Sequence, residues 1–559
     1  MKKINFTTVI TFSLCSILFP LVHTTNAIAI KPMNNPGNVT VNQVMEQIRP
    51  ESIKAHTAFL SDDQLEGRRT GTRGYMLAAK YIRSQCELNG LSGAAENKTY
   101  FQKVPFVRTM VLPNESSLRL TKGNEKRSLN YNKDFVILDT HRETEGSISG
   151  DLVFVGFGVT APEMGYDDYF GVDVKGKIVV MIMMAAPPTF PSAVRAYYSN
   201  HDIKRANAAA HGAQGIIYLR LPNWKWSSLL RGVSIGWNTL RWLDDNGKPN
   251  DMKDSLKIVA VLNNSEAGAM FATENRSLED VFASIDKGTL KGFRLSTHAD
   301  IAFKSRHEKF ECVNVIALLE GSDQILKKEY VLFSAHLDHF GIGKTIDGDS
   351  IYNGAIDNAG GCAELIELMR AYSSLSKPPK RSTVFLFTTA EECGQLGSDY
   401  FAHHPTIPLK QVVSDLNVDE PMSLIPVSDV IGFGCEHSSL GATVQLTAGK
   451  TGFTVNPDPY PDEGLFARSD VFPLVQEGIP SVWITVGTKS SQQGIDGLAV
   501  QKNWMVTNYH SPKDDLSQPI DFKTTAKFNR FLFLLGYTIA NNIDRPVWNK
   551  NDFFGNKFE

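Results

Sequence analysis

The chain has 559 residues, 42% hydrophobic and 21% charged, which is typical of a globular protein too long for one core, so two or three domains are expected. A formal net charge of −3 with no basic block argues against nucleic acid as a partner. Once Cys15 is removed with the leader described next, five cysteines remain, and this odd number argues against a disulfide scaffold.

Residues 1–29 are predicted to be a signal peptide for export. Lys2 and Lys3 provide positive charge, residues 9–22 are mostly apolar, and small residues follow at Ala27 and Ala29. The alternative is a membrane anchor, but the apolar stretch is shorter than the roughly 20 residues that a span needs. No later stretch is long enough to span a membrane, so we expect no stable membrane insertion and a periplasmic or secreted location.

Residues 43–145 are predicted to form the first part of the main domain. Helical spacing of apolar residues is present at 44–60 and again at 74–91. Residues 101–106 and 111–120 have the pattern of strands. A polar linker precedes the first of these elements.

Residues 146–305 have a different pattern of predicted strands and helices, and we interpret this segment as an inserted domain. A predicted strand at 152–158 ends in glycine turns, and a second strand is predicted at 176–183. An alanine-rich helix at 203–211 leads into a strand at 212–219. The segment contains none of the metal-ligand candidates described below.

Residues 306–545 alternate strictly between apolar strands and amphipathic helices, and residues 546–559 form a C-terminal tail. The predicted strands are 313–319, 330–334, 382–389, 412–418 and 481–486, and the predicted helices are 360–373 and 522–543. This pattern predicts an α/β fold whose mixed, mostly parallel sheet is covered by helices on both faces. In such sheets, sites lie beyond the carboxyl ends of the strands.

Five short segments with oxygen and nitrogen ligands follow strands or glycine turns. They are His336-Leu337-Asp338, Asp357-Asn358, Glu391-Glu392, Asn417-Val418-Asp419 and Tyr509-His510. Each is weak evidence alone, since a Glu-Glu pair usually begins a solvated helix and His-x-Asp is usually a turn. Together, two histidines and three carboxylates could bind two divalent cations and leave positions open for water and substrate.

Residues 52–105 and 313–545 resemble the M28 family of co-catalytic zinc aminopeptidases. The match is carried by residues 334–341 (SAHLDHFG), 353–361 (NGAIDNAGG), 389–398 (TAEECGQLGS), 417–419 (NVD) and 509–512 (YHSP), and by the pattern from 468 to 480. The resemblance implies a zinc-peptidase-like α/β/α fold and two Zn²⁺ ions per chain. Asp357 would bridge both ions, with His336 and Asp419 completing one site and Glu392 and His510 the other.

The resemblance also implies catalytic roles. Glu391 would take a proton from a water shared by the two ions and deliver it to the leaving amine. Asp338 would accept a hydrogen bond from the second ring nitrogen of His336. Tyr509 could donate to the developing oxyanion, or it packs against its neighbour and positions it.

Other titratable residues are weaker candidates. Asp415 competes with Asp419, although the Asn-x-Asp pattern favours the latter, and Asp470 is a candidate supporting residue. Four histidines are predicted to be loop or surface residues: His339, His403, His404 and His437. Cys362 and Cys393 lie beside ligand candidates but are expected to pack as small apolar residues.

The insert resembles the protease-associated (PA) domain, a β-rich α+β domain that interrupts some members of the family. The similarity is carried by residues 156–158, 165–169, 176–177 and 212–215, none of which is catalytic. A domain of this kind could form a wall over the active-site cleft and restrict access to short peptides. A structural or docking role is the alternative.

The sequence therefore predicts an exported di-zinc aminopeptidase that acts on peptides with a free N-terminus. The alternatives are a carboxypeptidase or dipeptidase on the same fold, a single-zinc glutaminyl cyclase, and a non-catalytic receptor-like homologue. The full set of five ligands argues against the last two. A carboxypeptidase would need cations that clamp a carboxylate, and near the five segments only Lys344, Lys513 and Arg468 are available, with no arginine cluster.

Overall fold

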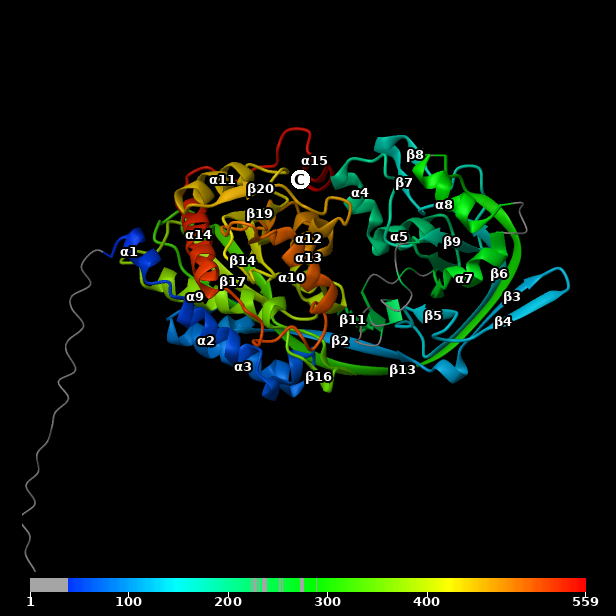
Figure 1. Ribbon diagram of the computed structural model, residues 1–559, viewed down its shortest axis with the longest axis horizontal. Coiled ribbons are helices and arrows are strands. Elements are labelled where there is room, and N and C mark those ends of the chain that lie inside the picture. Colours follow the sequence, from blue (N-terminus) through cyan, green and yellow to red (C-terminus); the bar gives the residue numbers. More distant parts are fainter. Residues whose placement is uncertain are drawn as a thin grey trace, which may run out of the picture.

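The computed structural model describes residues 39–559 except 223–224, 226–228, 231, 234–238, 251–252, 254, 272–275 and 288. The predicted signal peptide at 1–29 lies outside these residues. Two sheets with their own helices lie side by side and are connected along the long strand β13 (Phe293–Leu319), which crosses between them (Figure 1). In the described part of the chain, no helix is both long enough and apolar enough to cross a membrane.

The first sheet is mixed, and its four central strands are parallel. Its order is β11 (Leu240–Trp242), β2 (Phe101–Val111), the second half of β13, β17 (Ser382–Thr388), β14 (Tyr330–His336), β18 (Val412–Val418), β21 (Ser481–Val486), β19 (Asp429–Phe433) and β20 (Thr454–Asn456). The parallel strands are β17, β14, β18 and β21. They are buried almost throughout, as expected for strands that are covered on both faces.

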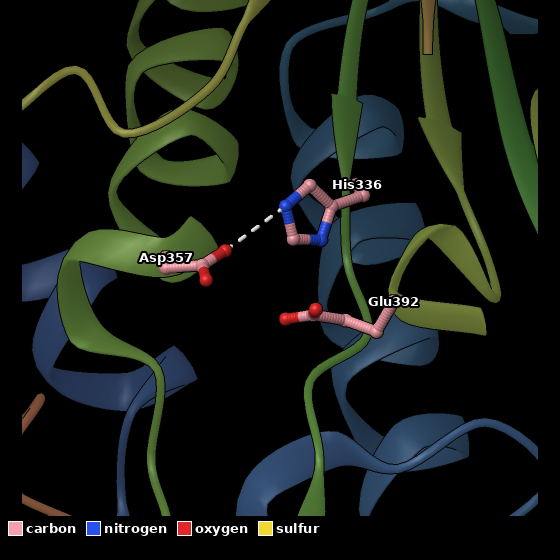
Figure 2. A group of neighbouring side chains, drawn as sticks. All are labelled: His336, Asp357 and Glu392. Atoms are coloured by element: carbon pink, nitrogen blue, oxygen red, sulfur yellow. Dashed lines mark ion pairs between the residues drawn. The ribbon is translucent and has the colours of Figure 1, made fainter. Parts of the chain in front are cut away.

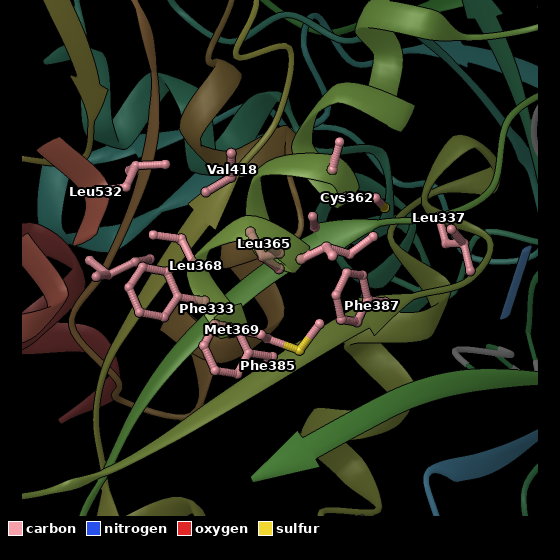
Figure 3. Close-up of a cluster of buried hydrophobic side chains, with 14 of the residues drawn as sticks. Phe333, Leu337, Cys362, Leu365, Leu368, Met369, Phe385, Phe387, Val418 and Leu532 are labelled. Atoms are coloured by element: carbon pink, nitrogen blue, oxygen red, sulfur yellow. The ribbon is translucent and has the colours of Figure 1, made fainter. Parts of the chain in front are cut away.

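Helices cover both faces of this sheet. On one face lie α1 (Val41–Glu46), α2 (Pro50–Leu60), α3 (Arg73–Leu88), α9 (Gly361–Ser373) and α14 (Phe522–Asn541), and on the other lie α10 (Leu396–His403) and α12 (Val471–Gln476). Side chains alternate between the two cores: Phe333 and Phe385 stack 5.6 Å apart beneath α9, whereas Leu332 and Leu386 face α10. Figure 3 shows the first of these cores. The predicted α/β fold is therefore confirmed.

The helix predicted at 44–60 is two helices. Helix α1 ends at Glu46, and α2 begins with Pro50 at its first position. Proline lacks the backbone N–H that a continuing helix needs, but it is well tolerated in a first turn. The spacing of apolar residues continues across residues 47–49, so it does not reveal this break.

The second sheet includes the predicted insert. Its order is β4 (Glu125–Leu129), β3 (Ser117–Lys122), the first half of β13, β6 (Glu145–Phe154), β9 (Ile178–Ile182), β10 (Gly215–Leu219), β12 (Ile258–Leu262) and β5 (Phe135–Leu138). Helices α4 (Ser192–Ser199), α7 (Asn264–Phe271) and α8 (Leu278–Asp286) contribute to the core on one face, and α5 (His201–Ala210) contributes to the core on the other. The sheet thus has its own hydrophobic cores.

The pairing of strands shifts the expected boundaries. Residues 117–138, assigned above to the main domain, belong to the second sheet, because β3 pairs with β13 and β5 pairs with β12. Conversely, β11 lies within the predicted insert but forms the edge of the first sheet. That the second sheet is a separately folding domain stays a prediction.

The remaining described strands and α-helices have at most 11 residues each. They are β1 (Ser92–Gly93), β7 (Thr160–Ala161), β8 (Tyr166–Asp167), the hairpin β15 (Gly341–Ile346) and β16 (Asp349–Tyr352), α11 (Leu440–Lys450), α13 (Gly497–Thr507) and α15 (Phe553–Phe558). Helix α15 occupies the predicted tail. Its Phe554 is fully buried beside Phe466 and Phe472, so this segment packs on the main domain.

Candidate metal centre

The candidate ligands come together at one edge of the first sheet. His336 is the last residue of β14, Glu391 and Glu392 follow β17, and Asp419 follows β18. These strands are adjacent and parallel, so their carboxyl ends meet at the same edge. Asp357 reaches the same place from the buried segment that precedes α9.

Asp357 lies at the centre of two groups of side chains. His336 Nε2 is 3.1 Å from Asp357 Oδ1 and 3.1 Å from Asp419 Oδ1. His510 Nε2 is 3.1 Å from Asp357 Oδ2 and 3.4 Å from Glu392 Oε2. One carboxylate is thus shared, each of its oxygens facing one histidine, and each histidine has a further carboxylate beside it. Figure 2 shows His336, Asp357 and Glu392 converging on a common space.

The backbone around Asp357 is held by a residue that the sequence analysis missed. Asp514 is fully buried, and its two carboxylate oxygens accept from the backbone N–H groups of Ile356 (2.9 Å) and Asp357 (3.1 Å). Asn358, joined to Asp357 by a cis peptide bond, donates its side-chain amide to the carbonyl of Val418 (2.9 Å). The only available signal was the position of Asp514, four residues beyond a ligand candidate.

Asp338 supports the site, but not by the contact that we expected. His336 Nδ1 is 3.1 Å from the backbone carbonyl oxygen of Asp338, so that carbonyl, and not the carboxylate, is the partner of the ring. The carboxylate accepts from the backbone N–H groups of Glu391 (3.1 Å) and Glu392 (3.4 Å). Asp338 therefore fixes the turn that presents both glutamates.

Glu391 differs from its neighbour in its contacts. Its Oε1 accepts from Gln395 Nε2 at 3.1 Å, and that amide also donates to the carbonyl of Arg468 at 3.1 Å. Among the described residues, no histidine lies within ion-pair distance of Glu391, whereas Glu392 contacts two. The carboxylate of Glu391 therefore lies outside the group of candidate metal ligands, whereas that of Glu392 lies within it.

His339 lies in the loop that follows β14, as predicted, but it is not a surface residue. It is fully buried, with Nδ1 2.6 Å from Glu392 Oε1 and 3.9 Å from Asp357 Oδ2. Burial lowers the pKa of His339 well below its usual value, so the ring is neutral. Its position directly after Asp338 in a ligand segment was the signal that could have identified it.

Tyr509 stacks on His510, with ring centroids 3.6 Å apart. Burial raises the pKa of its hydroxyl well above the usual value, so the group stays protonated and remains a donor. Both residues line a cavity of about 1710 Å³ that opens between the two sheets. The stacking fits the positioning role, and exposure to the cavity leaves the donor role open.

The weaker candidates are placed as follows. Asp415 is buried inside the sheet and accepts from Ser334 Oγ at 2.9 Å, away from the histidines. Asp470 accepts from Thr388 Oγ1 (2.5 Å) and Ser398 Oγ (2.6 Å). It therefore anchors the strand that precedes Glu391.

Two other expectations had mixed outcomes. His403 is exposed, as predicted, but His437 is buried, and its Nδ1 lies 2.7 Å from Asp552 Oδ2. No disulfide links the five described cysteines. Cys362 is fully buried, as expected of a small apolar side chain, and its thiol donates to the carbonyl of His336 (3.1 Å).

The charge balance of the site suits cations. Burial raises the pKa of Glu391 and of Glu392 well above the usual range, and for Glu392 the charge of Asp357 adds to the effect. Burial alone would lower the pKa of His336, but the carboxylates of Asp419 and Asp357 outweigh it and raise that pKa. The cluster thus holds more buried carboxylate than its histidines can neutralise.

Unpartnered atoms point to the same conclusion. Asp357 Oδ2, Glu392 Oε1 and both ring nitrogens of His339 are buried and make no hydrogen bond, although they lie close to one another. Buried polar atoms without partners are rare in folded proteins. Carboxylate oxygens and neutral imidazole nitrogens in this arrangement are ligands that Zn²⁺ prefers, so the residues fit a metal centre.

A buried arginine connects this centre to the N-terminal segment. Arg68 donates from Nε to the carbonyl of Leu337 (2.9 Å) and from its two terminal nitrogens to the carbonyls of Asn353 (2.6 Å) and Gly354 (3.0 Å). It therefore links the end of β14 to the segment that carries Asp357.

The chain is similar to known peptidases in its sequence and in its fold. Residues 314–535 match peptidase family M28. The protein named "probable leucine aminopeptidase 2" of Aspergillus oryzae is 26% identical over 235 residues, 40% of this chain and 44% of that protein. The "Vacuolar membrane protease" of Verticillium alfalfae is 25% identical over 155 residues, 25% of this chain and 14% of that protein. The chain thus spans less than half the length of these relatives.

Among solved structures, the fold is similar to that of an aminopeptidase from Aneurinibacillus sp. strain AM-1. The TM-score is 0.54 with 19% sequence identity, and the match covers 91% of this chain and 100% of that chain. At this identity the likeness concerns the fold. It includes both sheets, since nearly the whole chain is matched.

Proposed function

We propose that this chain, whose residues 314–535 match peptidase family M28, is a di-zinc aminopeptidase that removes N-terminal residues from peptides. The observation that carries the proposal is the sharing of Asp357 between two ligand groups, each with one histidine and one further carboxylate. One group would be His336, Asp357 and Asp419, and the other would be His510, Asp357 and Glu392. His339 lies beside the second group and would support it or join it.

When bound, a pair of Zn²⁺ ions would supply positive charge that acidifies water and polarises the scissile carbonyl. Glu391 would accept the proton of the attacking water and donate it to the leaving amine, because its carboxylate belongs to neither ligand group. Burial favours the protonated form of this carboxyl, which suits the second step. Gln395 holds the carboxylate in place.

Tyr509 would donate its hydroxyl hydrogen to the developing negative charge on the carbonyl oxygen. It lines the cavity beside His510, and its raised pKa keeps the proton available. Asp338 would act through the backbone N–H groups of the two glutamates, fixing their positions.

The preference for a free amino group rests on the charge of the site. Asp357, Glu391, Glu392 and Asp419 concentrate carboxylates where the substrate's first residue would lie, and carboxylates favour a cationic ammonium. A carboxypeptidase is the second candidate, and one observation favours it: Arg69, Arg108 and Arg220 also line the cavity. These arginines come from segments far from the five motifs, which is why the sequence pattern showed no cluster.

Two parts of the proposal concern the rest of the chain. We infer that residues 1–29 are an export signal and that the second sheet is a PA-like domain. Supporting the second inference, Leu138 at the end of β5 and Met183 just after β9 line the same cavity as His510. The insert would then form a wall of the substrate site.

The test is a hydrolysis screen of aminoacyl amides, unblocked peptides and N-blocked peptides, with and without a chelator. We expect cleavage of the amides and unblocked peptides only, and its loss with the chelator. Full activity after metal removal, confirmed by elemental analysis, would contradict the zinc mechanism. A protein that binds zinc but cleaves nothing would support a non-catalytic homologue instead.

A further inference from the structure

The cavity that contains Tyr509 and His510 is larger than one substrate residue requires. Its volume is about 1710 Å³, whereas most ligand sites are on the order of 300–1,000 Å³. The first sheet, the second sheet and the hairpin β15–β16 all contribute to its walls. It therefore has room for the residues that follow a scissile bond.

The walls of this cavity are cationic. Among the described residues that line it, six are basic: Arg69, Arg108, Arg220, Lys225, Lys344 and Arg468. Only three carboxylates accompany them, and two of these have cationic partners. Asp139 lies 3.1 Å from Arg205, outside the cavity, and Glu308 lies 3.1 Å from Arg108. Glu463 alone remains, so the wall has a clear excess of positive charge.

Arg69, like Arg108, lies beside the metal ligands. It lines the large cavity and also a narrow gap that Asp338, His339 and Glu392 share. Its side chain is half-buried, and in the described structure it forms neither an ion pair nor a hydrogen bond. A guanidinium that has lost part of its hydration without gaining a partner is suited to a carboxylate, which it can bind through two parallel hydrogen bonds.

Arg468 and Lys344 lie on the exposed part of the cavity. The backbone carbonyl of Arg468 accepts from Gln395, the same amide that holds Glu391. Its guanidinium donates to the carbonyl of Glu463 at 3.3 Å and forms no other hydrogen bond with the described residues. Lys344 belongs to β15 and has no acidic partner among the described residues. Among the residues that the structure describes, no carboxylate forms an ion pair with either side chain.

We propose that this wall binds a carboxylate of the substrate on the carboxyl side of the scissile bond. This inference rests on the proposed function. The acidic metal ligands would hold the ammonium end of a short peptide, and Arg69, Arg468 and Lys344 would hold its negative end. The carboxylate could be the C-terminus of a short peptide or the side chain of an aspartate or glutamate.

The experiment compares four tripeptides that share the first residue cleaved best in the screen. They end in alanine as the free acid, alanine amide, glutamate amide or lysine amide. We expect kcat/KM to be roughly tenfold higher for the free acid and the glutamate amide than for the alanine amide, and lowest for the lysine amide, as charge-assisted hydrogen bonds imply. The differences should shrink in about 0.5 M salt, because salt screens exposed charges.

The outcomes distinguish the C-terminal carboxylate from a side-chain carboxylate. They also distinguish failure of this inference from failure of the aminopeptidase proposal. A preference for the free acid alone would assign the C-terminus, and a preference for the glutamate amide alone would assign the side chain. Equal rates within about twofold for all four peptides would overturn the inference but leave the aminopeptidase proposal intact. Cleavage of none of them, with zinc bound, would defeat the proposed function itself.

Variants give a second test. Arg69→Gln, Arg468→Gln and Lys344→Gln should each lower the ratio of free-acid to amide rates, and the triple variant should bring it close to one. Lys450→Gln, an exposed basic residue at the end of α11 and outside this cavity, is the matched control. Zinc content and unfolding temperature check that each variant folds, and Arg468 and Lys344 are exposed enough to be replaced safely. A triple variant whose ratio equals that of the control would refute the role of this wall.

Discussion

Glu391 and Glu392 are adjacent in sequence, and replacing each by glutamine should have opposite consequences for metal binding. Glu391 is outside both ligand groups, and Gln395 donates to its Oε1, an acceptor that a glutamine side chain retains. Glu391→Gln should therefore keep the metal but lose the proton acceptor, which lowers kcat by roughly 10²–10⁴. At about 1.36 kcal/mol per tenfold, this is about 3–5 kcal/mol in the activation free energy.

Glu392→Gln should instead lose metal. Glu392 lies 2.6 Å from His339 and 3.4 Å from His510, inside the cluster, and an amide is a poorer ligand than a carboxylate. Even residues that only support metal ligands change affinity by about 10–100-fold, so a direct ligand should cost more. The assay is zinc content by elemental analysis after dialysis, with kcat on the best aminoacyl amide. A Glu391→Gln protein without metal, beside a Glu392→Gln protein with its full content, would show that the two roles are exchanged.

Three further predictions concern the metal, the second sheet and the division of the chain. Removing zinc should abolish activity and lower the unfolding temperature, with recovery at about two equivalents per chain; recovery at one equivalent would contradict the paired site. Lys204 is fully buried and donates to the carbonyls of Phe157 (2.9 Å), Ile182 (2.7 Å) and Ala185, so Lys204→Met should lower the free energy of unfolding by about 3 kcal/mol or more, measured in urea; a change below about 1 kcal/mol would refute this. Replacing residues 113–303 by a two-residue turn should give a shorter protein that still binds zinc, because Val111 and Ser305 already pair in antiparallel strands; a product without cooperative unfolding would show that the first sheet needs the insert or its edge strand β11.

The sequence predicted the parallel core well because its strands are short, mostly apolar segments that alternate with helices. The strands expected at 412–418 and 481–486 have those bounds in the structure. The location of the candidate ligands at one edge of the sheet could also be predicted, because parallel strands place their carboxyl ends together. In contrast, β13 runs through 27 residues and pairs in both sheets, and a pattern of local alternation carries no information about a change of partner.

The parts of the site that could not be predicted depend on long-range contacts. Arg69 and Arg108 are far in sequence from the motifs and reach the cavity only through the fold. The sequence also does not show which atoms form each hydrogen bond. The ring of His336 lies against the backbone carbonyl of Asp338, whereas the carboxylate of Asp338 accepts from backbone N–H groups. Residue type and spacing identify a side chain as a candidate, but they do not determine which of its atoms is used.

The central claim is that the enzyme cuts one residue from the amino end of a peptide. Mass spectrometry of one tetrapeptide, incubated with the zinc-loaded protein in its free, N-acetylated and C-amidated forms, tests this claim most directly. We predict loss of the first residue from the free and amidated forms, slower in the amidated one, and no cleavage of the acetylated form. Release of the last residue from the acetylated form, with the amidated form intact, would contradict the account and assign a carboxypeptidase.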